Sequence, residues 1–198
     1  LNIFDALIVG VLTLGFLLLI TGLHHTDGLL DFGDGLMYQG LPEKKIEIMH
    51  DQQMGAGGLA LGLVTILTTA LCIAQLNQNL VIQSLIVCEA SAKVAMVLMA
   101  WVGRSAHDGI NTYFVNAMHS QYRNIRLMIA LSIAFTIALS LLSVEGFIAI
   151  IAGLVAALVI VVISNRHFRG VTGDVFGTGN ELARLSSLMA ILVMVRWL

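Results

Sequence analysis

The sequence predicts an all-α, polytopic integral membrane protein, and two features of its composition lead to this prediction. Of its 198 residues, 58% are hydrophobic and only 11% are charged, whereas soluble domains are about 45–50% apolar and about 25% charged. The composition excludes an ordinary water-soluble globule, and it excludes a disordered chain because disorder goes with low hydrophobicity and high charge. The net charge of −2, without a dense basic cluster, gives no reason to expect nucleic acid as a partner.

Six apolar runs reach or approach the roughly 20 residues that a helix needs to cross a bilayer. They cover residues 6–23, 56–75, 80–103, 127–143, 147–164 and 182–198. Arg184 and Arg196 interrupt the last run, which we expect to be short or only partly inserted. We therefore expect a single helical domain over residues 1–198 with about six transmembrane helices. Because the chain begins at Leu1 just before an apolar run, we also expect that an N-terminal segment is missing from it.

The charges of the connections predict which face of the membrane is cytoplasmic. If each run crosses once, the long connections 24–55, 104–126 and 165–181 fall on one side and the tight links 76–79 and 144–146 on the other. The long connections hold seven lysines and arginines, and the tight links hold none. By the positive-inside rule, the long connections face the cytoplasm. We expect them to be the catalytic loops of a multi-pass protein of the cytoplasmic membrane.

Six of the twelve acidic residues lie within one short stretch of the first long connection. Asp27, Asp31 and Asp34 are spaced i, i+4, i+7, which on a helix places three carboxylates within about 60° of one face. Glu47 and Asp51 form a second i, i+4 pair. Carboxylates this close repel one another unless cations neutralise them, and oxygen donors without cysteine suit Mg²⁺ or Mn²⁺. The cluster therefore indicates metal-assisted phosphoryl transfer at a membrane surface, with a solvated acidic loop as the alternative.

Glycines 28, 33 and 35 are interspersed among these acids. They weaken a regular helix, but they would let a ligand approach the backbone closely.

Four segments, in the same order along the chain, resemble the motifs of one family. HHTDGLLDFGDG is similar to H-x-D-G-L-x-D-x-x-D-G, and KIEIMHD to R-x-x-E-I-M-x-D. RGVTGDVFGTGNE is similar to G-G-x-T-G-D-x-x-G-A-x-x-E, and DGINTYF to a weaker E-G-L-G-x-x-F. The chain thus resembles the cobalamin synthases, also called adenosylcobinamide-GDP ribazoletransferases. It departs from their pattern at Arg169, which replaces the first motif glycine, and at Ala106, where arginine is common.

The resemblance implies a reaction, a cofactor and partners. Members of the family transfer the adenosylcobinamide-phosphate group of adenosylcobinamide-GDP to α-ribazole or its 5′-phosphate. They release GMP and form adenosylcobalamin or its 5′-phosphate, in the last steps of cobalamin biosynthesis. They require Mg²⁺ and lie in the cytoplasmic membrane. The implied partners are therefore the two substrates and the lipid bilayer, and the sequence leaves both the preferred acceptor and assembly into a homo-oligomer open.

The resemblance and the acid spacing together suggest roles for single residues. One or two Mg²⁺ ions bridging the substrate diphosphate are expected at Asp27, Asp31, Asp34, Glu47 and Asp51. The D-x-x-D-G and E-x-x-x-D pieces are also similar to those of the CDP-alcohol phosphotransferases, a competing interpretation, although the A-R dipeptide of that class is absent here. A divalent-cation transporter is a further alternative, but it predicts midplane carboxylates in several spans, where only Glu89 qualifies.

His25 occupies the histidine position of the family motif and is a candidate catalytic base, with Asp31 and Asp34 as alternatives. A structural histidine at a helix end is the other interpretation. The residues expected to bind substrate are Lys45, Lys93, Arg104, Thr172, Gly173, Asp174 and Glu181. The glycine-rich segment 170–179 can cradle phosphate. Lys93 follows Glu89 by four residues within an apolar run, where a charged pair indicates either function or a structural ion pair.

Overall fold

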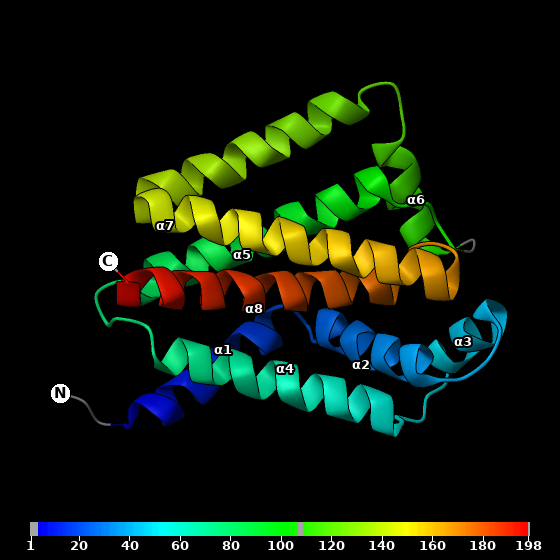
Figure 1. Ribbon diagram of the computed structural model, residues 1–198, viewed down its shortest axis with the longest axis horizontal. Helices are drawn as coiled ribbons and strands as arrows, with labels where there is room; N and C mark the ends of the chain where they lie inside the picture. Colours follow the sequence, from blue (N-terminus) through cyan, green and yellow to red (C-terminus); the bar gives the residue numbers. More distant parts are fainter. Residues whose placement is uncertain (1–3, 107–108, 198) are drawn as a thin grey trace.

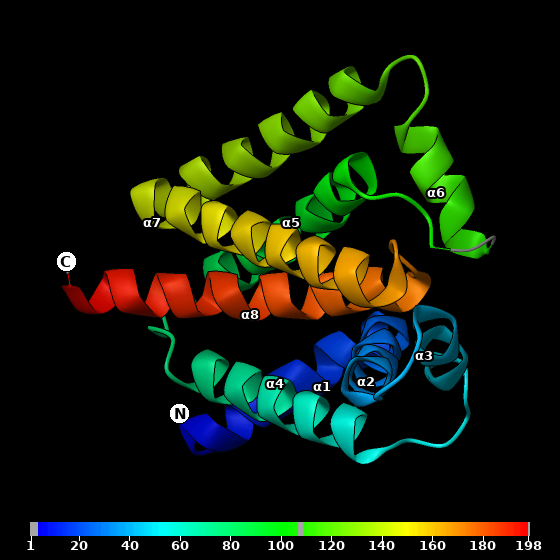
Figure 2. The same ribbon diagram turned by 45° about the vertical axis from the view of Figure 1, so that its right-hand side comes forward.

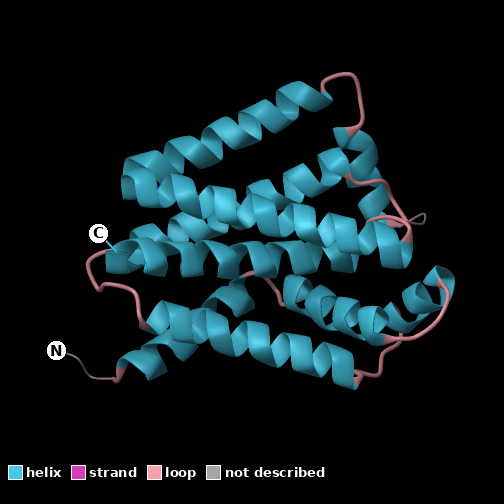
Figure 3. Ribbon diagram, in the orientation of Figure 1, coloured by secondary structure: helices cyan, strands magenta, loops and turns pink. Residues whose placement is uncertain are grey.

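The computed structural model describes residues 4–106 and 109–197, and these residues fold into eight helices (Figure 1). The helices are α1 (Ala6–Ile20), α2 (His24–Met37), α3 (Pro42–Met49), α4 (Ala56–Ala74), α5 (Val81–Val102), α6 (Ile110–Met118), α7 (Arg123–Phe168) and α8 (Gly173–Trp197). One isolated bridge pairs Ser105 with Val171 across two connections, and the described residues contain no strand (Figure 3). The prediction of an all-α protein is confirmed.

Three helices, α4, α5 and α7, are long and apolar enough to cross a membrane. Helices α1 and α2 are long and apolar enough only when they are counted together, and they are bent by 96° relative to each other. The described residues therefore hold three or four candidate spans. The chain is thus a multi-pass membrane protein, but the six expected spans are not found. The first apolar run gives α1, which at 15 residues is short for a span. The last run lies in α8, where Glu181 and Arg184 interrupt the apolar sequence.

Helix α7 takes in two of the six expected runs, 127–143 and 147–164. The backbone leaves helical geometry at Ser143, with φ 49° and ψ −125°, and the two arms of α7 fold back against each other there (Figure 1). A Cβ on Gly146 would lie closer to the carbonyl oxygen of Ala138 than real contacts allow, so the close approach of the two arms requires glycine at this position.

Helix α8 lies at the centre of the fold, between α7 and a layer made of α1, α2 and α4 (Figure 1 and Figure 2). It packs against α2, α4, α5 and α7. Two hydrophobic clusters flank its length: one joins α8 to α1, α4, α5 and α7, and the other joins it to α2, α3, α5, α6 and α7. Large apolar side chains remain exposed on the outer faces of α1, α4 and α7, as expected for surfaces that contact lipid.

The connections that follow α2, α3, α5, α6 and α7 gather at one end of the molecule, at the right of Figure 1. The link between α4 and α5 and the break at Ser143 lie at the opposite end. The expected loop 24–55 is largely helical, since it contains α2 and α3. Helix α2 starts near the middle of the molecule and carries the acidic motif toward the end where the connections gather (Figure 1).

Candidate active site

The direction of α2 is set by a sharp bend after α1. Gly22 and Leu23 both have positive φ, 71° and 62°, which glycine adopts freely and leucine rarely does. The hydroxyl of Thr21 donates to the carbonyl oxygen of Leu17 and completes the last turn of α1. The bend turns α2 away from the axis of α1, so the three aspartates of the motif lie along a separate, more polar helix.

The three glycines of α2 are contact points for three neighbouring elements. A Cβ on Gly28 would lie 2.8 Å from the Cα of Asp174 in α8, and one on Gly33 would lie 2.8 Å from the carbonyl oxygen of Gly57 in α4. A Cβ on Gly35 would overlap the side chain of Met49 in α3. The glycines therefore let other helices, and not a ligand, approach the α2 backbone. The helix stays regular because these contacts stabilise it.

Asp34 caps helix α4. Its Oδ2 accepts a hydrogen bond from the backbone N–H of Gly55 at 2.7 Å, and its Oδ1 accepts one from the N–H of Gly58 at 2.8 Å. The carboxylate thereby satisfies two of the N–H groups that a helix N-terminus leaves unpaired, and its charge lies at the positive end of the helix dipole. Asp34 was predicted to be a metal ligand and a candidate base, but both of its carboxylate oxygens already accept hydrogen bonds from backbone N–H groups.

Asp27, Asp31 and Asp51 line one pocket of about 460 Å³ between α2 and the segment that follows α3. The other lining residues are Leu30, Met49, His50, Gln52 and Met54. Asp51 also lines a neighbouring hollow of about 380 Å³ together with Asp34. The structure therefore brings together Asp27, Asp31 and Asp51 of the predicted metal set, with Asp34 beside them.

Glu47 lies apart from this pocket. Its exposed carboxylate accepts a hydrogen bond from Nζ of Lys44 at 2.6 Å. The i, i+4 spacing of Glu47 and Asp51 would place both on one helical face, but α3 ends at Met49, so the two residues do not share a helix.

Asp174, in the first turn of α8, joins the carboxylates of α2. Its backbone contacts Gly28, and its carboxylate interacts electrostatically with that of Asp31, as do those of Asp27 and Asp34. Burial raises the pKa of Asp174, and the nearby His50 side chain and a hydrogen bond from Thr172 partly offset this rise. In the described part of the chain, no lysine or arginine forms an ion pair with these carboxylates.

This set of donors fits a hard divalent cation in its chemistry, because it consists of carboxylate oxygens that, among the described residues, form no ion pair with a lysine or arginine. Among the described residues, however, no three His, Cys, Asp or Glu side chains are arranged as a ready-made metal site. Asp27, Asp31, Asp51 and Asp174 would have to adjust their side-chain rotamers to share an ion.

His25 and Lys93 lie on a different side of α2. Successive residues of a helix are turned by about 100°, so Asp27 lies about 200° around the helix from His25, and Asp31 and Asp34 follow on that far face. Nζ of Lys93 in α5 is 3.3 Å from Nε2 of His25 and donates to Oδ1 of Asn180 in α8 at 2.8 Å. The structure therefore does not bring the predicted base His25 into the carboxylate pocket.

The other predicted substrate-binding residues have mainly structural contacts. Lys45 is buried, and its Nζ lies 3.3 Å from the carbonyl oxygen of Leu36 and 3.0 Å from Nδ1 of His167. Thr172 accepts a hydrogen bond from the N–H of Val175 and so caps α8, whose first residue is Gly173. Arg104 has an exposed side chain, and its backbone carbonyl accepts a bond from Val171.

Sequence reasoning missed a buried ion network. Arg184 is 1% exposed and binds both Glu181, in its own helix, and Glu89 in α5. The i, i+3 spacing of Glu181 and Arg184 was a signal for the first of these pairs. The second pair depends on the packing of α5 against α8, which no local pattern reveals.

Residues 1–192 match the family model described as Cobalamin-5-phosphate synthase. The chain belongs to this family. Among its relatives, the adenosylcobinamide-GDP ribazoletransferase of Methanocella arvoryzae is 37% identical over 202 aligned residues, which cover 95% of this chain and 75% of that protein. The enzyme of the same name from Methanococcoides burtonii is 34% identical, covering 93% of this chain and 70% of that protein. No solved structure shows significant similarity to the chain.

In this member of the family, three of the four motif segments lie close together. The segment 24–35 forms most of α2, 45–51 supplies the end of α3 and His50 and Asp51 of the pocket, and 169–181 starts α8 beside Gly28. The family likeness and the geometry thus point to the same end of the molecule.

Proposed function

We propose that this protein is an adenosylcobinamide-GDP ribazoletransferase. In this reaction a ribose hydroxyl of α-ribazole, or of its 5′-phosphate, attacks the phosphorus attached to cobinamide. The phosphoanhydride bond breaks, GMP leaves, and the hydroxyl proton passes to a base. One observation carries the proposal: carboxylates from α2, from the segment after α3 and from the start of α8 meet at the end of the molecule where the connections gather.

Asp27, Asp51 and Asp174 are the residues that would hold Mg²⁺, and Asp31 lies beside them. When bound, the ion would supply positive charge to the substrate diphosphate and to the departing GMP. Asp34 plays a different part, because both of its oxygens already bind the N-terminus of α4. It fixes the angle between α2 and α4 and so keeps the pocket in shape.

Asp31 is the residue we assign as the base for the acceptor hydroxyl. Of the three predicted bases, it is the one that lines the carboxylate pocket. His25 lies on the opposite face of α2, and Asp34 is engaged as a helix cap. Burial of the Asp31 carboxyl, together with the nearby carboxylates of Asp174, Asp27 and Asp34, disfavours a negative charge at this position, which helps Asp31 to retain a proton once it has accepted one.

The carboxylate end of the molecule faces the cytoplasm in this proposal. Seven lysines and arginines lie in the connections assigned to that side, against none in the tight links. The nucleotide substrate would then be reached from the cytoplasm, while the apolar outer faces of α1, α4 and α7 contact lipid.

An acceptor-dependent GMP assay tests the proposal. Purified protein with Mg²⁺ is given adenosylcobinamide-GDP, with and without α-ribazole or α-ribazole 5′-phosphate. We expect GMP and a cobalamin product only when an acceptor is present, and no turnover with the Asp31→Asn variant. Release of GMP that ignores the acceptor, or no release with either acceptor, would overturn the proposed function.

A further inference from the structure

An electroneutral group of four charged residues lies at the interface of α5 and α8. Nε of Arg184 donates to Oε1 of Glu89 at 2.5 Å, and its Nη1 donates to Oε2 of Glu181 at 2.5 Å. Lys93 is the fourth member, with Nζ 4.0 Å from Oε2 of Glu89. Two positive and two negative charges balance, but the pairing is uneven because Arg184 takes the close contacts with both glutamates.

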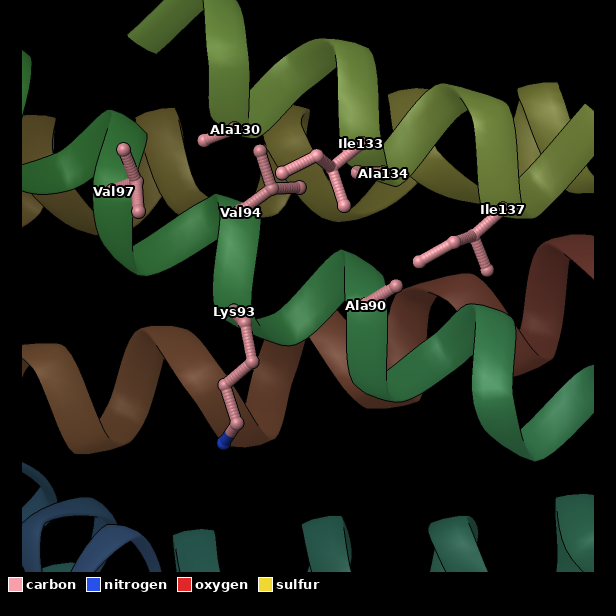
Figure 4. Close-up of a pocket in the computed structure, with 8 residues that line it drawn as sticks. All are labelled: Ala90, Lys93, Val94, Val97, Ala130, Ile133, Ala134 and Ile137. Carbon is pink, nitrogen blue, oxygen red and sulfur yellow. The ribbon is translucent and has the colours of Figure 1, made fainter. Parts of the chain in front are cut away.

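Lys93 is left with mainly neutral partners and an accessible ammonium. Its close contacts are Oδ1 of Asn180 at 2.8 Å and Nε2 of His25 at 3.3 Å. Its side chain is 51% exposed, whereas that of Arg184 is 1% exposed. Figure 4 shows the Lys93 side chain extending across α8, away from the apolar side chains that line the neighbouring pocket between α5 and α7. The Lys93 side chain therefore points away from that apolar pocket, and about half of its surface stays exposed.

The depth of Lys93 makes this exposure costly without a ligand. It lies nine residues before the end of α5, or about 13 Å from that end at 1.5 Å per residue. A charge at such a depth in a spanning helix is expensive unless it is paired or hydrated, and it marks a functional site by default. Phosphate is the ligand class that a lysine ammonium beside an amide and an imidazole suits.

We propose that Lys93 binds a phosphate group of a substrate, and that Arg184 is a positioning residue that keeps Lys93 free to do so. Glu89 and Lys93 stand at i, i+4 on α5, the spacing at which a glutamate and a lysine pair favourably. Arg184 prevents a tight pair because its planar guanidinium already binds both Glu89 and Glu181. Without Arg184, Glu89 closes on Lys93 and neutralises the ammonium.

This inference rests on the proposed function, which supplies two phosphate sources: the diphosphate of adenosylcobinamide-GDP and the 5′-phosphate of α-ribazole 5′-phosphate. The Lys93→Met variant separates them. A rise in KM for adenosylcobinamide-GDP assigns Lys93 to the diphosphate. A rise in KM for α-ribazole 5′-phosphate, with that for α-ribazole unchanged, assigns it to the acceptor. Unchanged KM values for all three overturn the proposal.

The role of Arg184 is tested with a variant that stays electroneutral. In E181Q/R184Q only Glu89 and Lys93 keep their charges, so they are expected to pair. The KM of the substrate affected in Lys93→Met should rise by about ten- to hundredfold, with kcat nearly unchanged. Adding Lys93→Met to E181Q/R184Q should raise KM no further, because the two changes remove the same interaction.

Rescue distinguishes positioning from a merely structural role. Adding Glu89→Gln to E181Q/R184Q frees Lys93 again, and KM should return toward the wild-type value. A KM that stays high in the triple variant, or a wild-type KM in E181Q/R184Q, overturns the role of Arg184. If E181Q/R184Q does not fold, the single variant Glu89→Gln decides: KM should be no higher than in the wild type, and a rise contradicts the proposal. Wild-type protein without acceptor-dependent GMP release would instead count against the proposed function.

Discussion

Asp34 offers a direct test of how the site is built, because its carboxylate is assigned to capping α4. Replacing it with alanine removes two hydrogen bonds to the N–H groups of Gly55 and Gly58. Each such cap stabilises by about 1 kcal/mol, and loss of the charge at the helix N-terminus adds about 0.3–1 kcal/mol. We expect Asp34→Ala to lower the free energy of unfolding by about 2–3 kcal/mol, or the Tm by roughly 5–10 °C.

Thermal unfolding in detergent with EDTA measures this effect without any contribution from a bound metal. Asp34→Asn should lose about half as much stability, because its amide keeps one acceptor oxygen and no charge. Asp31→Ala is the matched control from the same helix. Asp31 faces other carboxylates, so its removal should leave the Tm unchanged or raise it. A wild-type Tm for Asp34→Ala would refute the capping argument.

Adding Mg²⁺ separates the cap from the proposed ligands. A ligand that binds only the folded state raises its stability, so Mg²⁺ should raise the Tm of the wild type and of Asp34→Asn alike. It should raise the Tm of Asp27→Asn much less. If instead Mg²⁺ fails to stabilise Asp34→Asn, Asp34 belongs to the metal site as the sequence predicted.

Three further predictions follow from the geometry of α2, α3 and α8. Gly28→Ala should lower the free energy of unfolding by about 1–3 kcal/mol and remove most of the activity, because its Cβ would meet the backbone of Asp174. Gly173→Ala should fold normally, because a Cβ at Gly173 has open space around it. Equal Tm values for the two variants would contradict this prediction. Asp174→Asn should raise the Tm at pH 8 while lowering turnover, because burial raises the pKa of Asp174 and its ionised form opposes folding. That gain in Tm should shrink as the pH falls and the wild-type carboxyl becomes protonated, and a gain that grows toward low pH would exclude this cause. Glu47→Gln should keep the wild-type kcat/KM because Glu47 lies outside the pocket, whereas Asp51→Asn should lower kcat/KM. A lower kcat/KM in Glu47→Gln would show that Glu47 belongs to the site after all.

Composition and hydropathy were sufficient to predict the all-α membrane class and two of its helices, α4 and α5. The run 56–75 is one residue longer than α4 at its C-terminal end, and the run 80–103 is one residue longer than α5 at each end. They are continuous apolar stretches, and the backbone in lipid must satisfy its hydrogen bonds within each segment. The 96° bend between α1 and α2, and the break at Ser143 inside α7, follow from packing and backbone geometry that hydropathy does not record.

The candidate site was predictable where its residues share a helix. Asp27 and Asp31 share one face of α2 and one pocket, as their i, i+4 spacing indicates. The same rule misplaced Glu47, because it assumed that α3 continues to Asp51. Asp174 reaches the pocket only through the contact of α8 with Gly28, a relation between residues 146 positions apart in the chain.

The placement of charges along α8 explains why the last apolar run, 182–198, gave only a weak indication of a membrane span. Asp174, Glu181 and Arg184 are spaced i, i+7, i+10, so they follow one face of α8, and Gly177 at i+3 lets α2 approach that face closely. A hydropathy average counts these charges as interruptions of a span, whereas a helical projection separates a polar stripe from an apolar remainder. Because that stripe faces α2 and α5, Glu181 and Arg184 are buried against protein and Asp174 is partly buried, so these charges stay out of lipid. Buried charge of this kind is costly unless it is paired. Within α8, Glu181 pairs with Arg184. Glu89 of α5 also pairs with Arg184 and lies 4.0 Å from Lys93, so it links Lys93 to the network.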